Sequence, residues 1–322
     1  MLLLLFLIVL LLYICIRIFV SRKSESLACL VGKTALVTGG NSGLGYATSF
    51  LLASRGCRVI IADRNNSDKT VEEIKRITGN QQITYMSLDL SSLKLTREFA
   101  KELKKTETKI DIFINNAGIG NSDKLKTNDD LNTVMHINYF GAFLLTHLLL
   151  DLLRAAESPR VIFMGSISIF FNNLTMKNLN YIKHDKTTWR KDLYSNSKLC
   201  DVLAAQEFSK KLKRFNIMVN SVDPGIVDTN LFPSSYAISP SWLYEVLTYI
   251  TLKIIGTKAF GGAQTIFDVA TNPKLASQTG KHYSYLMQWF KPSILGSQKF
   301  CDDVWKKSEE LVKLSPEERI PN

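Results

Sequence analysis

The chain has 322 residues and a formal net charge of +11 at pH 7, a length that suits one large α/β domain with short appendages. Hydrophobic residues make up 46% of it, which is enough for a packed core and excludes a disordered chain. The five cysteines form no CxxC pair, so we expect a reduced protein without a disulfide framework and without a metal site. The lysines are scattered and no recognition motif accompanies them, so we expect no nucleic-acid partner.

Residues 1–16 carry no charge, and Arg17, Arg22 and Lys23 follow this apolar run. A helix over 1–20 would be about 30 Å long at ~1.5 Å per residue, enough to cross a bilayer core. A cleaved signal peptide needs a basic start and a small-residue cleavage site, which this segment lacks, and a buried core helix is the other alternative. We therefore expect a membrane anchor over 1–20 and a linker over 21–30. The positive-inside rule then places the rest of the chain in the cytosol, on the endoplasmic reticulum or a lipid droplet.

From Thr34 onward, apolar runs rich in Val and Ile alternate with segments of helical periodicity. Such strands, separated by helices, indicate a parallel sheet covered on both faces. The sequence therefore predicts an α/β fold, a doubly wound parallel sheet of the Rossmann type, as one domain over 31–290 followed by a C-terminal tail over 291–322. The expected strands are Thr34–Val37, Arg58–Ala62, Ile83–Leu88, Ile110–Ile114, Arg160–Met164 and Ile217–Val222. The expected helices are Ala47–Ser54, Val71–Ile77, Leu95–Lys105, a long one from Leu131 to Ala155, and Leu193–Leu212.

A glycine-rich turn, T-G-G-N-S-G-L-G, follows the first expected strand and opens the first helix. Backbone N–H groups of such a turn approach a pyrophosphate at the helix N-terminus, where the helix dipole favours negative charge. A strand–helix turn that binds nothing is the alternative, because glycine is the default turn residue. The expected nucleotide contacts in this turn are Gly39, Asn41, Ser42, Gly43, Leu44 and Gly45.

Asp63 ends the second expected strand, where a carboxylate accepts hydrogen bonds from the adenosine ribose and repels a 2′-phosphate. Arg64 beside it would attract that phosphate, so NAD and NADP both stay open, and the position of the carboxylate favours NAD. An exposed Asp–Arg pair in a loop is the alternative. Further cofactor contacts are expected after the third and fourth strands, at Asp89, Leu90, Asn116, Ala117 and Gly118.

Tyr194 and Lys198 are four residues apart on an expected helix, so the phenol and the ammonium share a face. A free phenol has a pKa of ~10 and is a poor base at neutral pH, but a nearby ammonium and a nicotinamide cation would lower that pKa. Ser166 follows the fifth strand, where its hydroxyl can bind a substrate oxygen beside Tyr194, and Ser168 is the weaker candidate. Asn138 is a candidate to hold a water that relays protons to Lys198. The alternatives are a surface Tyr–Lys pair and a buried amide that only serves structure.

Over residues 33–288 the chain resembles the short-chain dehydrogenase/reductase family. The resemblance is carried by an ordered set of motifs: TGxxxGxG, D-L, N-N-A-G, Asn138, Ser166, YxxxK and Pro224-Gly225. The apolar N-terminus, the long gap between Ser166 and Tyr194, and G-G-A-Q-T over 261–265 look like its membrane-tethered retinol dehydrogenase-like branch. The resemblance implies a catalytic set and further cofactor contacts after the sixth strand. Three residues depart from the branch. Asp63 stands where NADP-preferring members carry a non-acidic residue, Asp223 where a histidine is common, and Gly165 where a serine is common before Ser166. The implied catalytic residues are Ser166, Tyr194, Lys198 and Asn138, and the further cofactor contacts are Pro224, Gly225, Val227 and Thr229, with Tyr194 and Lys198 also touching the cofactor.

Residues 229–258 are rich in apolar side chains, several of which share one helical face. We expect either ordinary core packing or an apolar lid that admits a lipophilic alcohol from a bilayer. The sequence therefore predicts an oxidoreductase that transfers a hydride between NAD or NADP and a lipophilic alcohol or carbonyl of retinoid, steroid or isoprenoid type. A homo-oligomer is compatible with it. The competing hypothesis is a catalytically silent nucleotide-binding scaffold on the membrane, which the presence of Tyr194 and Lys198 disfavours.

Overall fold

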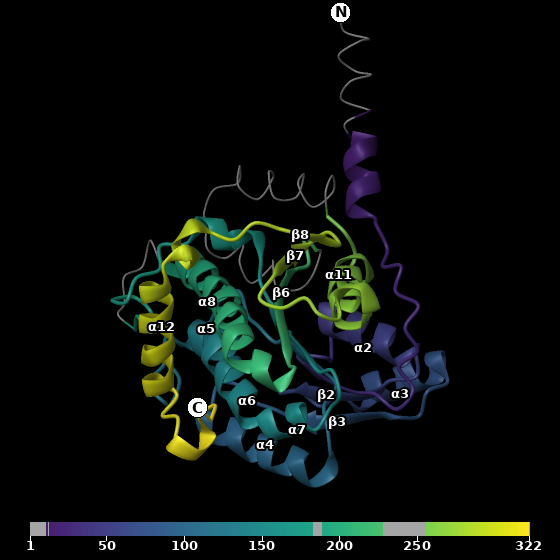
Figure 1. The fold of residues 1–322 in the computed structure, drawn as a ribbon, viewed down its shortest axis with the longest axis horizontal. Helices are drawn as coiled ribbons and strands as arrows, with labels where there is room; N and C mark the ends of the chain where they lie inside the picture. Colours follow the sequence, from purple (N-terminus) through teal and green to yellow (C-terminus); the bar gives the residue numbers. More distant parts are fainter. Residues whose placement is uncertain (1–10, 12, 183–188, 228–255, 322) are drawn as a thin grey trace, which may run out of the picture.

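The computed structural model describes residues 11, 13–182, 189–227 and 256–321. Its centre is an eight-stranded sheet in the order β3-β2-β1-β4-β5-β6-β7-β8 (Figure 1). Neighbouring strands pair in parallel except β7 and β8, which are antiparallel. The strands are β1 (Thr34–Thr38), β2 (Arg58–Asp63), β3 (Ile83–Ser87), β4 (Ile112–Asn115), β5 (Arg160–Met164), β6 (Met218–Asp223), β7 (His282–Ser284) and β8 (Met287–Gln288).

Helices cover both faces of this sheet, which confirms the predicted doubly wound fold (Figure 1). Side chains alternate along each strand, so β1 sends Leu36 into one core cluster and Ala35 and Val37 into the other. Both clusters are apolar, which is why the strands read as continuous hydrophobic runs. One face carries α2 (Gly43–Ala53), α3 (Asp68–Thr78) and α11 (Ala259–Thr271). The other carries α4 (Leu93–Thr106), α6 (Gly141–Leu148), α7 (Leu150–Arg154) and α8 (Trp189–Leu212).

The stretch predicted as one helix from Leu131 to Ala155 is divided, so that prediction was wrong in detail. It consists of α5 (Thr133–Met135), a π-helical turn over His136–Phe140, α6 and α7. Leu149 interrupts the last two with φ −93° and ψ 7°, outside the helical region. Insertions of π type commonly occur at functional sites, and this one carries Asn138.

The C-terminal segment packs on the same core as the sheet. It contains α12 (Gln298–Leu311), whose Trp305 ring lies 4.8 Å from the ring of Phe143 and 4.7 Å from that of Phe208. The segment predicted as a C-terminal tail over 291–322 therefore contributes α12 to the helical layer beside α8. The domain boundaries themselves stay predictions.

Two predicted segments fall largely outside the described residues. The predicted lid over 229–258 is described only from residue 256, and the predicted anchor over 1–20 only at residue 11 and over 13–20, where it is helical. The part of the chain that the structure describes contains no helix with the length and apolarity that crossing a membrane requires. The described end of the N-terminal helix contacts the body of the protein, since Arg17 donates to the Gly256 carbonyl at 3.1 Å.

Candidate active site

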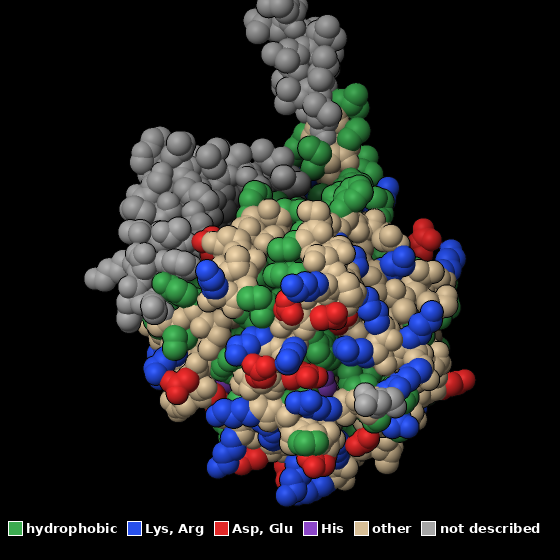
Figure 2. Space-filling view, turned by 60° about the vertical axis from the view of Figure 1, so that its left-hand side comes forward, with side chains coloured by type: hydrophobic (Ala, Val, Ile, Leu, Met, Phe, Trp, Pro, Cys, Tyr) green, Lys and Arg blue, Asp and Glu red, His purple; other side chains and the backbone are tan. Residues whose placement is uncertain are grey.

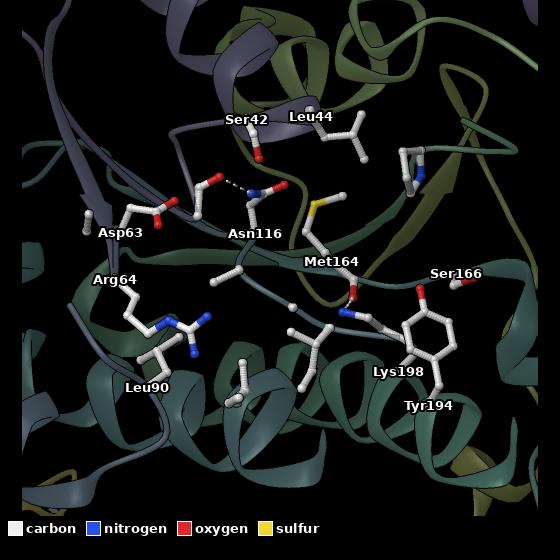
Figure 3. Close-up of a pocket in the computed structure, with 18 of the residues that line it drawn as sticks. Ser42, Leu44, Asp63, Arg64, Leu90, Asn116, Met164, Ser166, Tyr194 and Lys198 are labelled. Atoms are coloured by element: carbon white, nitrogen blue, oxygen red, sulfur yellow. Dashed lines mark hydrogen bonds between the residues drawn. The ribbon is translucent and has the colours of Figure 1, made fainter. Parts of the chain in front are cut away.

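A cavity of about 630 Å³ lies at the carboxyl ends of the parallel strands. The chain order reverses there, because β1 has β2 on one side and β4 on the other. Such a switch point is where open α/β sheets bind their ligands. The predicted site residues that line the cavity are Gly39, Ser42, Gly43, Leu44, Asp63, Arg64, Asp89, Leu90, Asn116, Ala117, Gly118, Ser166, Tyr194, Lys198, Pro224, Gly225 and Val227 (Figure 3).

Four predicted site residues are not in that lining. Thr229 lies outside the described residues. Gly45 and Asn41 support the glycine turn: a Cβ on Gly45 would lie 2.1 Å from the Gly39 carbonyl oxygen, and the N–H of Asn41 donates to Asp63 at 3.3 Å. Asn138 lies beneath the loop that follows β4, as described below.

Thr38, which sequence reasoning did not single out, joins the glycine turn to the loop after β4. Its hydroxyl oxygen accepts hydrogen bonds at 3.0 Å from the N–H groups of both Asn116 and Ala117. The Asn116 side chain in turn donates to the Thr38 carbonyl at 2.8 Å and the Gly39 carbonyl at 3.1 Å. The only available signal was the threonine that precedes the first glycine of the motif. These bonds fix two cavity walls relative to each other.

Asp63 and Arg64 diverge at the end of β2. Figure 3 shows the Asp63 carboxylate directed toward the glycine turn and the Arg64 guanidinium directed toward Leu90. Two backbone N–H groups hold the carboxylate, that of Asn41 at 3.3 Å and that of Asn65 at 3.0 Å. The acidic group is thus fixed at the strand end, whereas the arginine side chain is exposed.

Ser166, Tyr194 and Lys198 come together at one end of the cavity (Figure 3). Ser166 caps the 3₁₀ turn Ile167–Phe171 after β5, and its hydroxyl lies beside the phenol of Tyr194 (Figure 3). Lys198 lies one helical turn beyond Tyr194 on α8, with its ammonium 5.9 Å from the centre of the phenol ring. That ammonium also donates to the Met164 carbonyl and to the Asp201 carboxylate, both at 3.0 Å.

The ionisation of Tyr194 differs from the sequence expectation of a lowered pKa. Burial raises the pKa of Tyr194, while the Lys198 charge and the hydrogen bond with Ser166 act in the opposite direction without cancelling it. The carboxylates of Asp223 and Asp201 raise it further. The protein alone therefore favours the neutral phenol, because a buried phenolate loses its hydration.

Asn138 connects the loop after β4 to α8. Its Oδ1 accepts from the N–H of Ile119 at 2.8 Å, and its Nδ2 donates to the Ile119 carbonyl at 3.0 Å and to the Ser197 hydroxyl at 2.9 Å. The oxygen and the nitrogen of this amide thus both have partners within the protein. This is the arrangement expected of a buried amide that only serves structure. A role in proton relay stays a prediction.

Asp223, the departure noted before Pro224-Gly225, stabilises the turn after β6. Its carboxylate accepts from the N–H of Gly225 at 2.9 Å, and Gly225 has a positive φ of 77°. Burial raises the pKa of Asp223 to about 6. An acid at this position therefore shapes the backbone that closes one side of the cavity.

Several lining residues were missed because they have no motif of their own. Most are neighbours of predicted residues in sequence: they complete a strand end or continue the loop after β4. Their proximity to a strand terminus was the only signal. They are Ala62, Asn65, Leu88, Ile119, Asn121, Ile137, Met164 and Gly165.

Comparison with known proteins assigns the family. The family model for short chain dehydrogenases matches residues 33–178. Over 91% of its length the chain is 32% identical to dehydrogenase/reductase SDR family member 13 of Bos taurus, covering 77% of that protein. It is 37% identical to retinol dehydrogenase 13 of Mus musculus over 90% of its length and 86% of that protein. The chain belongs to the short-chain dehydrogenase/reductase family.

Solved structures agree on the fold of this short-chain dehydrogenase. The 3-oxoacyl-[acyl-carrier protein] reductase of Brucella melitensis, in complex with NAD, superimposes with a TM-score of 0.61 at 22% identity, over 82% of this chain and 96% of that one. The similarity to retinol dehydrogenases 11 to 14 places the chain in the retinol dehydrogenase-like branch. It is an NAD(P)-dependent oxidoreductase that acts on CH–OH groups.

The cavity fits a nicotinamide dinucleotide. Its volume lies within the range of ~300–1,000 Å³ that is typical of small-molecule sites. The glycine turn packs tightly against the loop after β4, since a Cβ on Gly39 would lie 2.8 Å from the Ala117 Cα, and its backbone lines the cavity. Asp63 is held at one end of the cavity and the Ser166–Tyr194–Lys198 group lies at the other. The residues present can therefore hold both ends of the dinucleotide.

Proposed function

We propose that this short-chain dehydrogenase interconverts a lipophilic alcohol and its carbonyl, with Ser166, Tyr194 and Lys198 as the catalytic residues. The observation that carries the proposal is their convergence at the end of the cavity opposite Asp63. Bound nicotinamide accepts or donates the hydride. Tyr194 takes the hydroxyl proton when the alcohol is oxidised and returns it when the carbonyl is reduced. Ser166 orients the substrate oxygen, and Lys198 stabilises the phenolate form of Tyr194.

Apolar side chains around the catalytic end support a lipophilic substrate. Ile119 and Ile137 line the cavity, and the turn that begins after Ser166 leaves Phe171 74% exposed. Ile169 of the same turn is fully buried, so it belongs to the core and not to the substrate surface. Exposed aromatic groups beside a cavity favour contact with an apolar molecule.

The test is a turnover assay of the full-length protein in detergent, with NAD and with NADP. Retinoid, steroid and isoprenoid alcohols are compared with short-chain alcohols that carry the same CH–OH group. We expect reduced-cofactor absorbance to rise with members of the lipophilic set only. Nucleotide binding without turnover on any alcohol or carbonyl would favour the silent scaffold instead.

We propose NAD as the preferred cofactor, because Asp63 is held at the strand end by two backbone N–H groups. Asp63→Ala is expected to raise the efficiency with NADP relative to NAD, since it removes a carboxylate that repels the 2′-phosphate and leaves Arg64 in place. Measured kcat/KM with each cofactor gives this ratio. Arg64→Ala is the matched control and should lower NADP use. An unchanged ratio in Asp63→Ala would show that this carboxylate does not face the ribose.

We propose that residues 1–20 anchor the protein in a membrane, with the body in the cytosol. The exposed apolar side chains of Ile14 and Ile18 on the described helix support this, and Figure 2 shows hydrophobic side chains gathered at its base. The full chain should stay in the membrane pellet through a carbonate wash, and deletion of 1–20 should release it. Neither exposed sequon, at Asn65 and Asn173, should carry glycan, because glycosylation requires the lumen. A mobility shift on endoglycosidase treatment would place the body in the lumen.

A further inference from the structure

A buried ion pair lies directly behind the proposed catalytic tyrosine. The Lys198 ammonium is 3.0 Å from Oδ2 of Asp201, and the two side chains are 6% and 3% exposed. The proposed acid–base mechanism assigns no role to Asp201. Taking two charges out of water costs several kcal/mol per ion, so a pair at this depth is weak evidence for stability. Because Lys198 lies one helical turn from Tyr194, we ask what the pair contributes to the reaction.

The Asp201 carboxylate has fewer hydrogen-bond donors around it than the carboxylate of a comparable ion pair on the same helix. Oδ1 of Asp201 is buried, and no donor in the described part of the chain reaches it. Glu207 forms a pair of the same spacing with Lys210 on the same helix, but Lys210 is 45% exposed and Glu207 also accepts a hydrogen bond from Gln298 at 3.2 Å. The Asp201 carboxylate thus belongs to a buried ion pair in which only one of its oxygens has a hydrogen-bond donor within the described residues.

The Lys198 ammonium is shared between two groups on opposite sides. Tyr194 lies one helical turn before it and Asp201 about one turn after it, while the Met164 carbonyl at the end of β5 takes a third contact at 3.0 Å. We propose that Asp201 is a positioning residue that fixes the Lys198 ammonium against the end of β5 and, through its negative charge, opposes ionisation of Tyr194. This inference rests on the proposed acid–base role of Tyr194.

The electrostatics of the surrounding groups agree with this arrangement. Burial raises the pKa of Asp201 to about 7 despite the neighbouring ammonium. Burial lowers the pKa of Lys198, but the charges of Asp201 and Tyr194 outweigh it, so the pKa lies above its usual value. The other titratable groups that sense Asp201 are Cys200 on α8 and Tyr139 on the π-helical turn, and burial raises the pKa of both, which keeps them neutral. Asp201 and, at slightly lower pH, Asp223 are therefore the groups acting on Tyr194 whose charge changes near neutral pH.

The charge of Asp201 sets the direction in which it shifts the pKa of Tyr194. Above about pH 7 the Asp201 carboxylate is ionised and raises the pKa of Tyr194, as the Asp223 carboxylate also does. Below about pH 7 Asp201 takes up a proton, and the ammonium then acts on Tyr194 alone. Asp201→Asn keeps an oxygen acceptor for Lys198 but removes the charge at every pH. This variant also removes a charge that raises the pKa of Lys198, so the comparison is made at pH values where Lys198 stays protonated. There the phenol should ionise at lower pH than in the wild type.

The experiment measures Tyr194 in two ways on the full-length protein. The first is the pH profile of kcat/KM for alcohol oxidation, whose rising limb reports the base form of Tyr194. The second is an ultraviolet titration of tyrosinate without substrate, with the signal of Tyr194→Phe subtracted. In Asp201→Asn both curves should move to lower pH. Asp201→Leu, which removes charge and acceptor, should in addition lower kcat by up to about 10²-fold, because the ammonium loses its position.

The matched control is Glu207→Gln, which removes the charge of an equivalent pair remote from the cavity. Its two curves should superimpose on those of the wild type. Curves for Asp201→Asn that superimpose on the wild type, or move to higher pH, would overturn the proposal. The tyrosinate titration needs no turnover, so it decides this question even if Asp201→Leu fails to fold. Full activity of Tyr194→Phe would instead overturn the proposed function, which is a distinguishable failure.

Discussion

Tyr194→Phe is expected to abolish turnover while nucleotide binding stays nearly unchanged. The phenol of Tyr194 lies beside the Ser166 hydroxyl at the catalytic end, and the Lys198 ammonium is 5.9 Å from the centre of its ring. General acid–base groups contribute about 10²–10⁴-fold to rate, and Phe retains the ring that packs in the cavity wall. We expect kcat to fall by that factor. Steady-state kinetics and a nucleotide binding titration measure the two quantities separately.

The matched control is Tyr85→Phe, which removes a hydroxyl from β3 without touching the cavity lining. It should keep wild-type kcat. Residual activity of Tyr194→Phe above a tenth of wild type would rule out Tyr194 as the proton donor and acceptor. A parallel loss of nucleotide affinity would instead mean that the substitution damaged the binding end of the site.

Gly45→Ala should impair both folding and nucleotide binding, although it adds only one methyl group. The new Cβ would lie 2.1 Å from the carbonyl oxygen of Gly39 and 2.6 Å from Nδ2 of Asn116, which is inside any van der Waals contact. The nearest atom belongs to the backbone, so the turn itself must shift. Overpacking of this kind typically costs ~1–3 kcal/mol, and here the displaced atoms include a wall of the cavity. Tm and nucleotide Kd should both worsen.

Gly296→Ala provides the comparison, because a Cβ there meets nothing within 4 Å. It should leave Tm and nucleotide Kd close to wild type. If Gly45→Ala matched it in both measurements, the close packing of the glycine turn against the loop after β4 would not be a requirement of this site.

The strands of the sheet and the edge at which the cavity lies follow from patterns in the amino-acid sequence. Buried parallel strands must be apolar on both faces, so Thr34–Val37 and Arg58–Ala62 are recognisable as strands from the sequence. In the structure each strand continues for one residue more. Strand ends in such a sheet converge on one edge, which is why the sequence predicts Asp63, Asn116 and Ser166 around one cavity, and all three line it. The spacing of Tyr194 and Lys198 needed only helical periodicity.

The hydrogen-bond partners of these groups, and how deeply each is buried, follow only from the folded structure. The sequence placed Asn138 near the site, but only the fold shows that its amide hydrogen-bonds to Ile119 and Ser197, which are distant in sequence. Thr38 joins two cavity walls through contacts about 78 residues apart along the chain. The ionisation of Tyr194 depends on how deeply it is buried and on the Asp223 and Asp201 carboxylates, which no local pattern reports. Periodicity reveals which face a residue occupies, whereas hydrogen bonding and desolvation depend on neighbours that only folding brings into contact.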